Sequence, residues 1–131
     1  MRTLTDHTVP GDSANHQLTI EVLDEPGQGG ACHYYGIYGM YSKTNESNPD
    51  KDETAVKLCF QNGPIKEFGV NGVTHEALMA IVIDRLRSFQ AGPFANEFNA
   101  VALTDCEHAL FMLQTRTRER IARGVEGTHQ K

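Results

Sequence analysis

The sequence lacks tryptophan, has few cysteines and contains no long apolar run. A membrane-spanning helix needs about 18 consecutive apolar residues, so we expect none here. The chain does not open on a charged segment followed by an apolar one, so we expect no secretory signal. The three cysteines, Cys32, Cys59 and Cys106, are an odd number without metal-type spacing. We therefore expect reduced thiols in a cytosol, and neither a metal nor another cofactor.

The chain also lacks a broad basic region. It has 12 basic and 17 acidic side chains and a formal net charge of −5. Residues 114–131 nevertheless hold five basic side chains against two acidic ones. A duplex-binding protein usually presents a wide basic face, whereas this chain has a short cationic end on an acidic body. The pattern favours a small anion over a nucleic-acid polymer, because an acidic body repels an extended phosphate backbone.

A length of 131 residues suits one compact unit, or a small sheet followed by a helical hairpin. Either half alone would bury little apolar surface, so association between copies would stabilise it. We therefore expect an α+β chain that forms a homo-oligomer.

The N-terminal half predicts a small antiparallel sheet. Residues 1–15 show no clear period, and we expect a flexible arm there. Residues 16–72 form the predicted sheet region, in which alternating or aromatic-rich patterns indicate strands at 16–24, 32–42 and 54–60. The segment IKEFGV is a candidate fourth strand. Three or four short strands would form a meander that needs a helix or a partner on its apolar face.

The C-terminal region, residues 73–131, predicts two amphipathic helices in an antiparallel hairpin. Thr74 is a suitable N-cap for the first helix, which ends at Gly92 and Pro93. The second helix is expected to begin near residues 95–98 and to end at Gly124, with arginines in its last turn. The apolar positions that follow helical spacing in the first helix are Leu78, Ile81, Val82, Leu86 and Phe89.

Four arginines lie within eight positions near the end of the second predicted helix: Arg116, Arg118, Arg120 and Arg123. Arg116 and Arg120 are one turn apart, so both should point the same way. Each guanidinium offers a planar fork for phosphate oxygens. The alternative is that these arginines only offset the helix dipole and keep the end soluble.

The corner between the two predicted helices holds Phe89 and Asn99. An aromatic ring and an amide can together bind a base, since the ring stacks and the amide hydrogen-bonds. Phe89 could instead close the core of the hairpin, and Asn99 could be a helix cap or an ordinary surface amide.

The two ends of the second predicted helix are too far apart for one small ligand. Asn99 and Arg116 are 17 residues apart, which is about 25 Å at the helical rise per residue. If both ends serve one pocket, the arginine end of one chain must meet the corner of another. Two-fold pairing would then create two equivalent pockets.

Residues 62–128, from NGPIKEFGVNGVTHEAL to RGVEGT, resemble the helical hairpin shared by phage anti-Thoeris and anti-CBASS sponge proteins. The strings THEALMAIVIDRLRSFQAGPF and RTRERIARGVEGT carry this likeness most specifically, and the added sheet makes the chain most similar to the type-1 Thoeris anti-defence family. The resemblance implies a phage protein that acts in the bacterial cytoplasm. It implies binding of glycocyclic ADP-ribose, the signal of bacterial TIR enzymes, and its sequestration without cleavage. It also implies homo-oligomers, commonly hexamers.

The resemblance further implies which residues would form the signal pocket. By that likeness Phe89 stacks on the adenine, Asn99 bonds the base or sugar, and Arg116 and Arg120 hold the pyrophosphate. The family also uses a basic residue from the sheet, for which Lys66 and Lys57 are both candidates. We prefer Lys66 because it lies close to the start of the hairpin.

Relatives also capture cyclic di- or trinucleotides at a second site. In this chain Arg123, Gly124 and Thr128 are the candidates for such a site. The same three residues could instead form a plain helix stop.

Two other functions fit the residues less well. An enzyme that hydrolyses the signal would need a nucleophile and a base, but no serine or cysteine stands in an elbow motif, and His75 and His108 lie on different predicted helices. A DNA-binding or protein-interaction module could use a hairpin. However, the joint is longer than a helix-turn-helix turn, and the second helix is too long and is acidic in its first half. We therefore expect a binding protein and not an enzyme.

Overall fold

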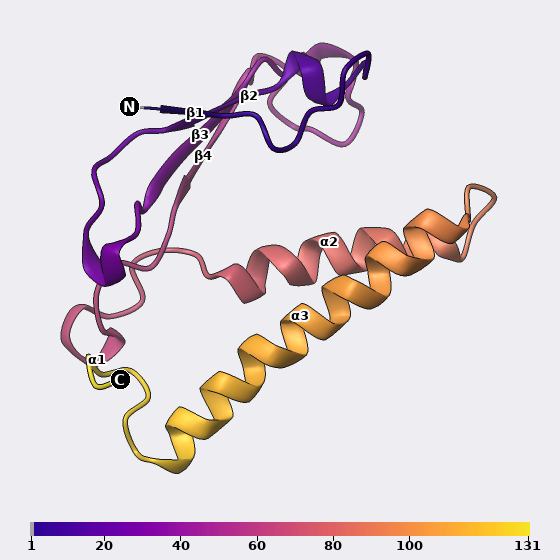
Figure 1. Ribbon diagram of the computed structural model, residues 1–131. Coiled ribbons are helices and arrows are strands. Elements are labelled where there is room, and N and C mark those ends of the chain that lie inside the picture. The colour runs from indigo at the N-terminus through magenta and orange to yellow at the C-terminus, as the bar shows by residue number, and fades with distance from the viewer. Residues whose placement is uncertain (1) are drawn as a thin grey trace. The chain divides into compact units, whose positions relative to one another are not determined.

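The computed structural model describes residues 2–131 and divides into two compact units, Met1–Asn62 and Gly63–Lys131 (Figure 1). The first unit contains the sheet and the second contains the helical hairpin. The predicted α+β class is thereby confirmed. The boundary between the units falls about ten residues before the position 72 that the sequence suggested.

The sheet is a four-stranded antiparallel meander. Its strands follow the chain in the order β1-β2-β3-β4, and each pairs with the next. The predicted meander is confirmed, and three of its strands lie inside the three predicted segments. The strands are β1 (Arg2–Leu4), β2 (Thr19–Val22), β3 (Tyr34–Tyr38) and β4 (Ala55–Cys59).

The first strand lies where we expected an arm without regular structure. Arg2 pairs with Val22 and Leu4 with Ile20, so residues 2–4 extend the sheet by one edge strand; Met1 lies outside the described residues. Further along this segment, the Asp12 carboxylate accepts hydrogen bonds from the backbone N–H groups of Val9 and His16, which lowers the pKa of Asp12. Three residues are too few to show an alternating pattern, so this strand could not be predicted from the sequence.

The candidate fourth strand at IKEFGV is wrong, because Ile65–Phe68 forms a short helix, α1. Its backbone closes helical bonds from Phe68 N to Pro64 O at 2.9 Å and from Gly69 N to Ile65 O at 2.8 Å. A proline immediately before the turn and a glycine immediately after it favour a single helical turn. Four residues cannot reveal whether the period is two or 3.6.

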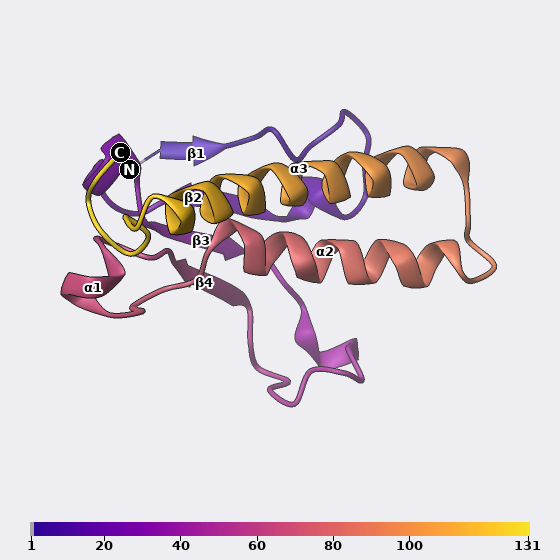
Figure 2. The same ribbon diagram turned by 90° about the horizontal axis from the view of Figure 1, so that it is seen from below.

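The hairpin consists of α2 (His75–Gln90) and α3 (Glu97–Ala122), which run antiparallel and side by side (Figure 2). The Thr74 hydroxyl accepts a hydrogen bond from Ala77 N at 3.1 Å, as its predicted role as N-cap requires. Across the pair, the guanidinium of Arg87 on α2 donates to the carboxylate of Glu107 on α3 at 2.7 Å.

The end of α3 follows the predicted glycine stop. Gly124 has a φ of +73°, Gly124 N donates to Ile121 O, and Val125 N donates to Arg120 O, both at 3.0 Å. These two bonds form a Schellman motif, which requires a left-handed residue at this position. The chain then folds back as a tail, residues 125–131.

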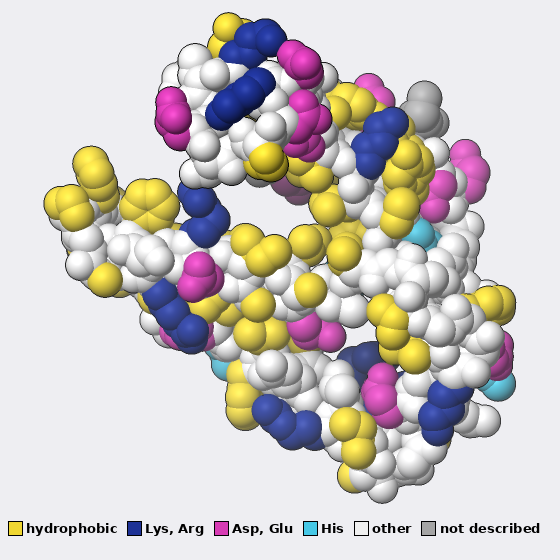
Figure 3. All heavy atoms as spheres, turned by 180° about the vertical axis from the view of Figure 1, so that it is seen from behind, with side chains coloured by type: hydrophobic (Ala, Val, Ile, Leu, Met, Phe, Trp, Pro, Cys, Tyr) yellow, Lys and Arg dark blue, Asp and Glu magenta, His cyan; other side chains and the backbone are white. Residues whose placement is uncertain are grey.

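Each unit has a small apolar core. The most buried apolar side chains are Val22 in β2, 1% exposed, and Ile83 in α2, 3% exposed. Ile81 and Val82, two of the positions with helical spacing, are instead largely exposed. Figure 3 shows hydrophobic side chains at the surface of the hairpin, including its tip. The exposed large apolar residues of α2, α3 and their connection are Ile81, Val82, Phe89, Phe94, Phe98, Val101, Phe111, Met112 and Ile121.

None of the helices formed by residues 2–131 is long and apolar enough to span a bilayer. The three cysteines are free thiols.

Candidate functional site

Phe89 and Asn99 meet at the corner of the hairpin. They line one groove of about 270 Å³, together with Val82, Arg85 and Leu86 of α2. The side chain of Phe89 is 42% exposed, so its ring is not closed inside the core of the hairpin. The structure thus brings together the two corner residues that the sequence singled out.

Phe89 also lines a second groove. It has a volume of about 250 Å³ and is lined by Ser88, Phe89, Gly92, Pro93 and Phe94. Since Phe89 lines both grooves, its ring offers apolar surface to each of them. The first groove differs from the second in having an amide and a guanidinium on its wall.

The helix cap at the start of α3 is Asn96, not Asn99. The Asn96 Oδ1 atom accepts a hydrogen bond from Asn99 N at 2.8 Å. The capping alternative for Asn99 therefore fails, and within residues 2–131 its side-chain amide has no hydrogen bond. An amide without an internal partner at a groove is available to a ligand.

Arg85 was not singled out from the sequence. Its guanidinium carbon lies 5.7 Å from the centroid of the Phe89 ring, within the range of a cation–π contact. The two residues are four positions apart on α2, which places their side chains on one face of the helix. That spacing was the available signal for Arg85 in the sequence.

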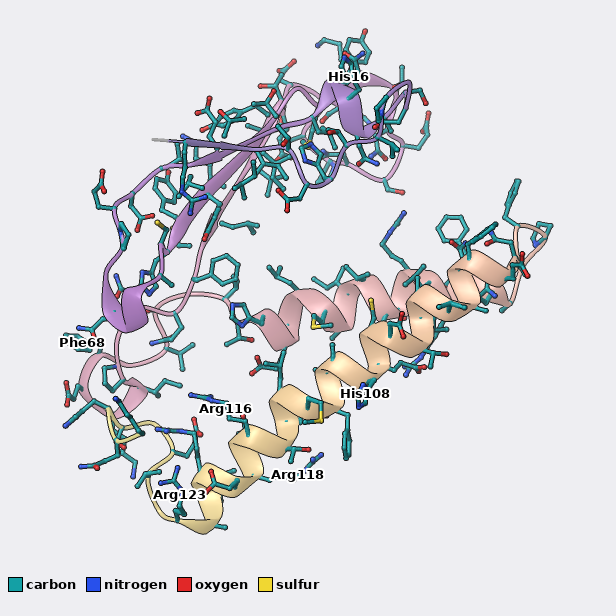
Figure 4. The ribbon with its side chains drawn as sticks, viewed as in Figure 1. His16, Phe68, His108, Arg116, Arg118 and Arg123 are labelled. Carbon is teal, nitrogen blue, oxygen red and sulfur yellow. The ribbon has the colours of Figure 1, made fainter. Side chains whose placement is uncertain are left out.

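Arg116 is exposed and, among the described residues, has no ion pair. Arg118 lies over the ring of Phe111, at 5.9 Å from its centroid. Figure 4 shows that Arg116 and Arg118 leave α3 on opposite sides. Of these two arginines, Arg116 is the one whose guanidinium makes neither an ion pair nor a ring contact among the described residues, so it is the more available to a phosphate.

Arg120 is buried, with only 7% of its surface exposed. Its guanidinium donates to three carbonyl oxygens of the tail, at Gln130 (2.6 Å), Val125 (2.9 Å) and Thr128 (3.1 Å). Its Nε atom also lies 3.3 Å from Glu126 Oε2, an ion pair without the alignment of a hydrogen bond. Arg120 therefore holds the tail against α3, and a ligand on this guanidinium would compete with the tail carbonyls.

The candidates for the second nucleotide site lie where α3 passes into the tail. Arg123 pairs with Glu119 and donates to Lys131 O at 2.7 Å. The Thr128 hydroxyl donates to Val125 O, and Gly124 forms the helix stop described above. These contacts give each of the three residues a local role.

Lys66 lies on α1 and not on a strand of the sheet. Its backbone N–H donates to Gly127 O at 2.8 Å, and a Cβ atom placed on Gly127 would approach Lys66 Cγ to 3.2 Å. Lys66 and Arg120 thus contact the same tail at the arginine end of the hairpin. Lys57 lies on β4, in the other unit.

We call the corner of the hairpin and its arginine end the two candidate half-sites. The helix α3 is continuous from Glu97 to Ala122, so Asn99 and Arg116 are about 25 Å apart along its axis. A nucleotide-sized ligand cannot reach both in one chain. Within residues 2–131 there is also no group of three or more His, Cys, Asp and Glu side chains that could hold a metal ion.

Residues 57–118 match the family model of the Acb2/Tad1 hairpin domain. The resemblance of this hairpin is confirmed. The matched segment of this chain includes Phe89, Asn99 and Arg116, and it ends before Arg120 and the tail.

The chain is also similar to a curated protein, Thoeris anti-defense 1 of Bacillus phage SBSphiJ7. The two are 54% identical over 72 residues, which cover 55% of this chain and 51% of the relative. The chain therefore spans about half the length of the curated relative it matches.

Proposed function

We propose that this chain is a phage anti-Thoeris sponge, which binds a glycocyclic ADP-ribose-type immune signal and sequesters it without cleaving it. The observation that carries the proposal is the corner groove. In it, an accessible aromatic ring and an unbonded amide meet inside the segment that matches the Acb2/Tad1 hairpin. The relative that shares 54% identity is named as a Thoeris anti-defence protein, which supports an anti-Thoeris role for this chain.

The two half-sites divide the ligand between them. Phe89 stacks on the adenine and Asn99 hydrogen-bonds the base or the sugar. Arg116 and Arg120 take the pyrophosphate, and Lys66 adds a point charge at the same end. Arg116 is exposed and unpaired and needs no rearrangement for this role, whereas Arg120 must exchange at least one tail carbonyl for a phosphate oxygen.

The pocket is shared between copies of the chain, because the half-sites of one chain are about 25 Å apart. The exposed apolar residues of the hairpin support association, since burying them between copies removes apolar surface from water. We propose a homo-oligomer, and a hexamer by the family resemblance. Within the infected bacterial cytoplasm, bound signal cannot reach its effector, so affinity and copy number decide the outcome.

A second site for cyclic di- or trinucleotides at Arg123, Gly124 and Thr128 is the weaker part of the proposal. Its support is the family resemblance alone, because the three residues already have local roles. Titration with cyclic dinucleotides alone, and then with protein saturated by glycocyclic ADP-ribose, tests it. Equal affinity in both titrations is expected for an independent site.

The test of the main proposal is calorimetric titration of the full chain with glycocyclic ADP-ribose. Arg116→Ala should abolish tight binding while light scattering shows an unchanged oligomer. Arg118→Ala is the matched control, because it removes the same charge from the opposite side of α3. Normal binding by Arg116→Ala would remove the pocket assignment.

A further inference from the structure

We infer that Arg85 is a further ligand-binding residue of the corner half-site, which holds an anionic group of the ligand next to the base. This inference rests on the proposed function. It adds a cation to a half-site that, from Phe89 and Asn99 alone, would recognise only the neutral part of a nucleotide.

The first argument is position. Arg85, Phe89 and Asn99 line the same groove of about 270 Å³. The Arg85 guanidinium lies over the Phe89 ring, at 5.7 Å from its centroid. The ring contact alone identifies no site, because Arg118 makes a similar contact with Phe111 at 5.9 Å. Arg85 differs because its ring partner shares a groove with an unbonded amide.

The second argument is charge. Within residues 2–131, Arg85 has no carboxylate partner, although α2 and α3 both carry acidic residues. Arg87, two positions further along α2, shows the ordinary arrangement, since it donates to Glu107 at 2.7 Å. A guanidinium that lines a groove without an acidic partner is free to pair with a phosphate.

The third argument is the change that a base would cause. The guanidinium occupies one face of the Phe89 ring, on the wall of the groove that also holds Asn99. A planar base that stacks there takes the place of the guanidinium, because stacking leaves no room for a second group on that face. The displaced guanidinium stays tethered to α2 and reaches the phosphate that follows the base. Arg85 thus selects ligands in which an anionic group lies close to the base.

The experiment is calorimetric titration of the full chain with glycocyclic ADP-ribose, using Arg85→Met, Arg85→Lys and the control Arg87→Met. Methionine keeps much of the length of the side chain and removes its charge. Arg85→Met should weaken binding by about 10- to 100-fold, the worth of a hydrogen bond to a charged group. Arg85→Lys should recover part of this loss, because the charge returns without the planar fork. Arg87→Met should bind like the unaltered chain.

Each other outcome has a definite meaning. Unchanged binding by Arg85→Met, or an equal loss in Arg87→Met, would overturn the role of Arg85 while the proposed function stands. An absence of binding by the unaltered chain would overturn the proposed function itself. If Arg85→Met does not fold, as judged by circular dichroism, Arg85→Lys decides: full affinity in that variant would contradict the need for a guanidinium fork.

Discussion

At the scale of single residues, Arg116 and Arg120 have different environments although their sequence pattern is the same. They are the same residue type, one helical turn apart, and the pattern predicted that they act together. In the structure one is exposed and unpaired, and the other is buried beneath the tail. Spacing along a helix predicts which way a side chain points. The burial of Arg120 depends instead on the tail, and the tail has no periodic pattern from which its fold could be predicted.

The two arginines should therefore respond differently to truncation. Arg120→Ala leaves partly buried tail carbonyls and Glu126 without their partner, which should cost about 3 kcal/mol of the free energy of unfolding. Arg116→Ala removes an exposed side chain and should change this free energy by less than about 0.5 kcal/mol. Urea denaturation measures both, and hydrogen exchange of the tail amides should accelerate in Arg120→Ala alone. Equal destabilisation of the two variants would contradict these roles.

Phe89 offers a second test at the residue scale. Phe89→Leu keeps an apolar side chain but removes the ring, and stacking on a base is worth about 1 to 3 kcal/mol. We expect binding of glycocyclic ADP-ribose to weaken by about 10- to 100-fold, with little change in melting temperature. Phe94→Leu is the control, because Phe94 lines only the groove without Asn99. A larger loss in Phe94→Leu would place the base in that other groove.

At the scale of elements, the sequence predicted the two long helices and their ends, because capping residues and a sustained helical period determine them. Thr74 caps α2, the start of α3 falls within the predicted residues, and Gly124 ends α3. The errors concern elements too short to have a period, namely β1 and α1. Ile81 and Val82 follow the helical spacing and are nevertheless exposed, because a period identifies an apolar face but not what covers it.

The contribution of the helix stop at Gly124 to stability can be measured by substitution. Its φ of +73° is unfavourable for any residue with a Cβ, so Gly124→Ala should cost about 1 kcal/mol of stability. Gly92→Ala is a matched control: Gly92 has no positive φ, and its nearest contact for a Cβ would be an ordinary 3.5 Å. Thermal melting should separate the two variants. Equal melting temperatures would show that the Schellman stop contributes nothing measurable.

At the scale of the whole molecule, the small cores and the exposed apolar residues of the hairpin favour association. From the length of the chain we expected association, and from the separation of Asn99 and Arg116 along α3 we expected a shared pocket; both stay predictions. The number of subunits and the pairing of half-sites could not be predicted from sequence patterns. Both depend on surface complementarity between copies of the chain.

Mixing two inactive variants tests the shared pocket. Arg116→Ala and Phe89→Ala should each fail to bind glycocyclic ADP-ribose when alone. Co-refolded in equal amounts, they should recover about a quarter of the sites, because a pocket then takes Phe89 from one chain and Arg116 from another. Calorimetric stoichiometry measures the recovery. No recovery in a mixed oligomer would mean that each pocket belongs to one chain.

The central claim is capture without cleavage, and ligand recovery tests it most directly. The full chain is incubated with excess glycocyclic ADP-ribose, separated from free ligand by gel filtration and heat-denatured, and the released small molecules are identified by mass spectrometry. The account predicts that intact ligand is recovered in stoichiometric amounts. A hydrolysed product, or no retained ligand at all, would contradict it.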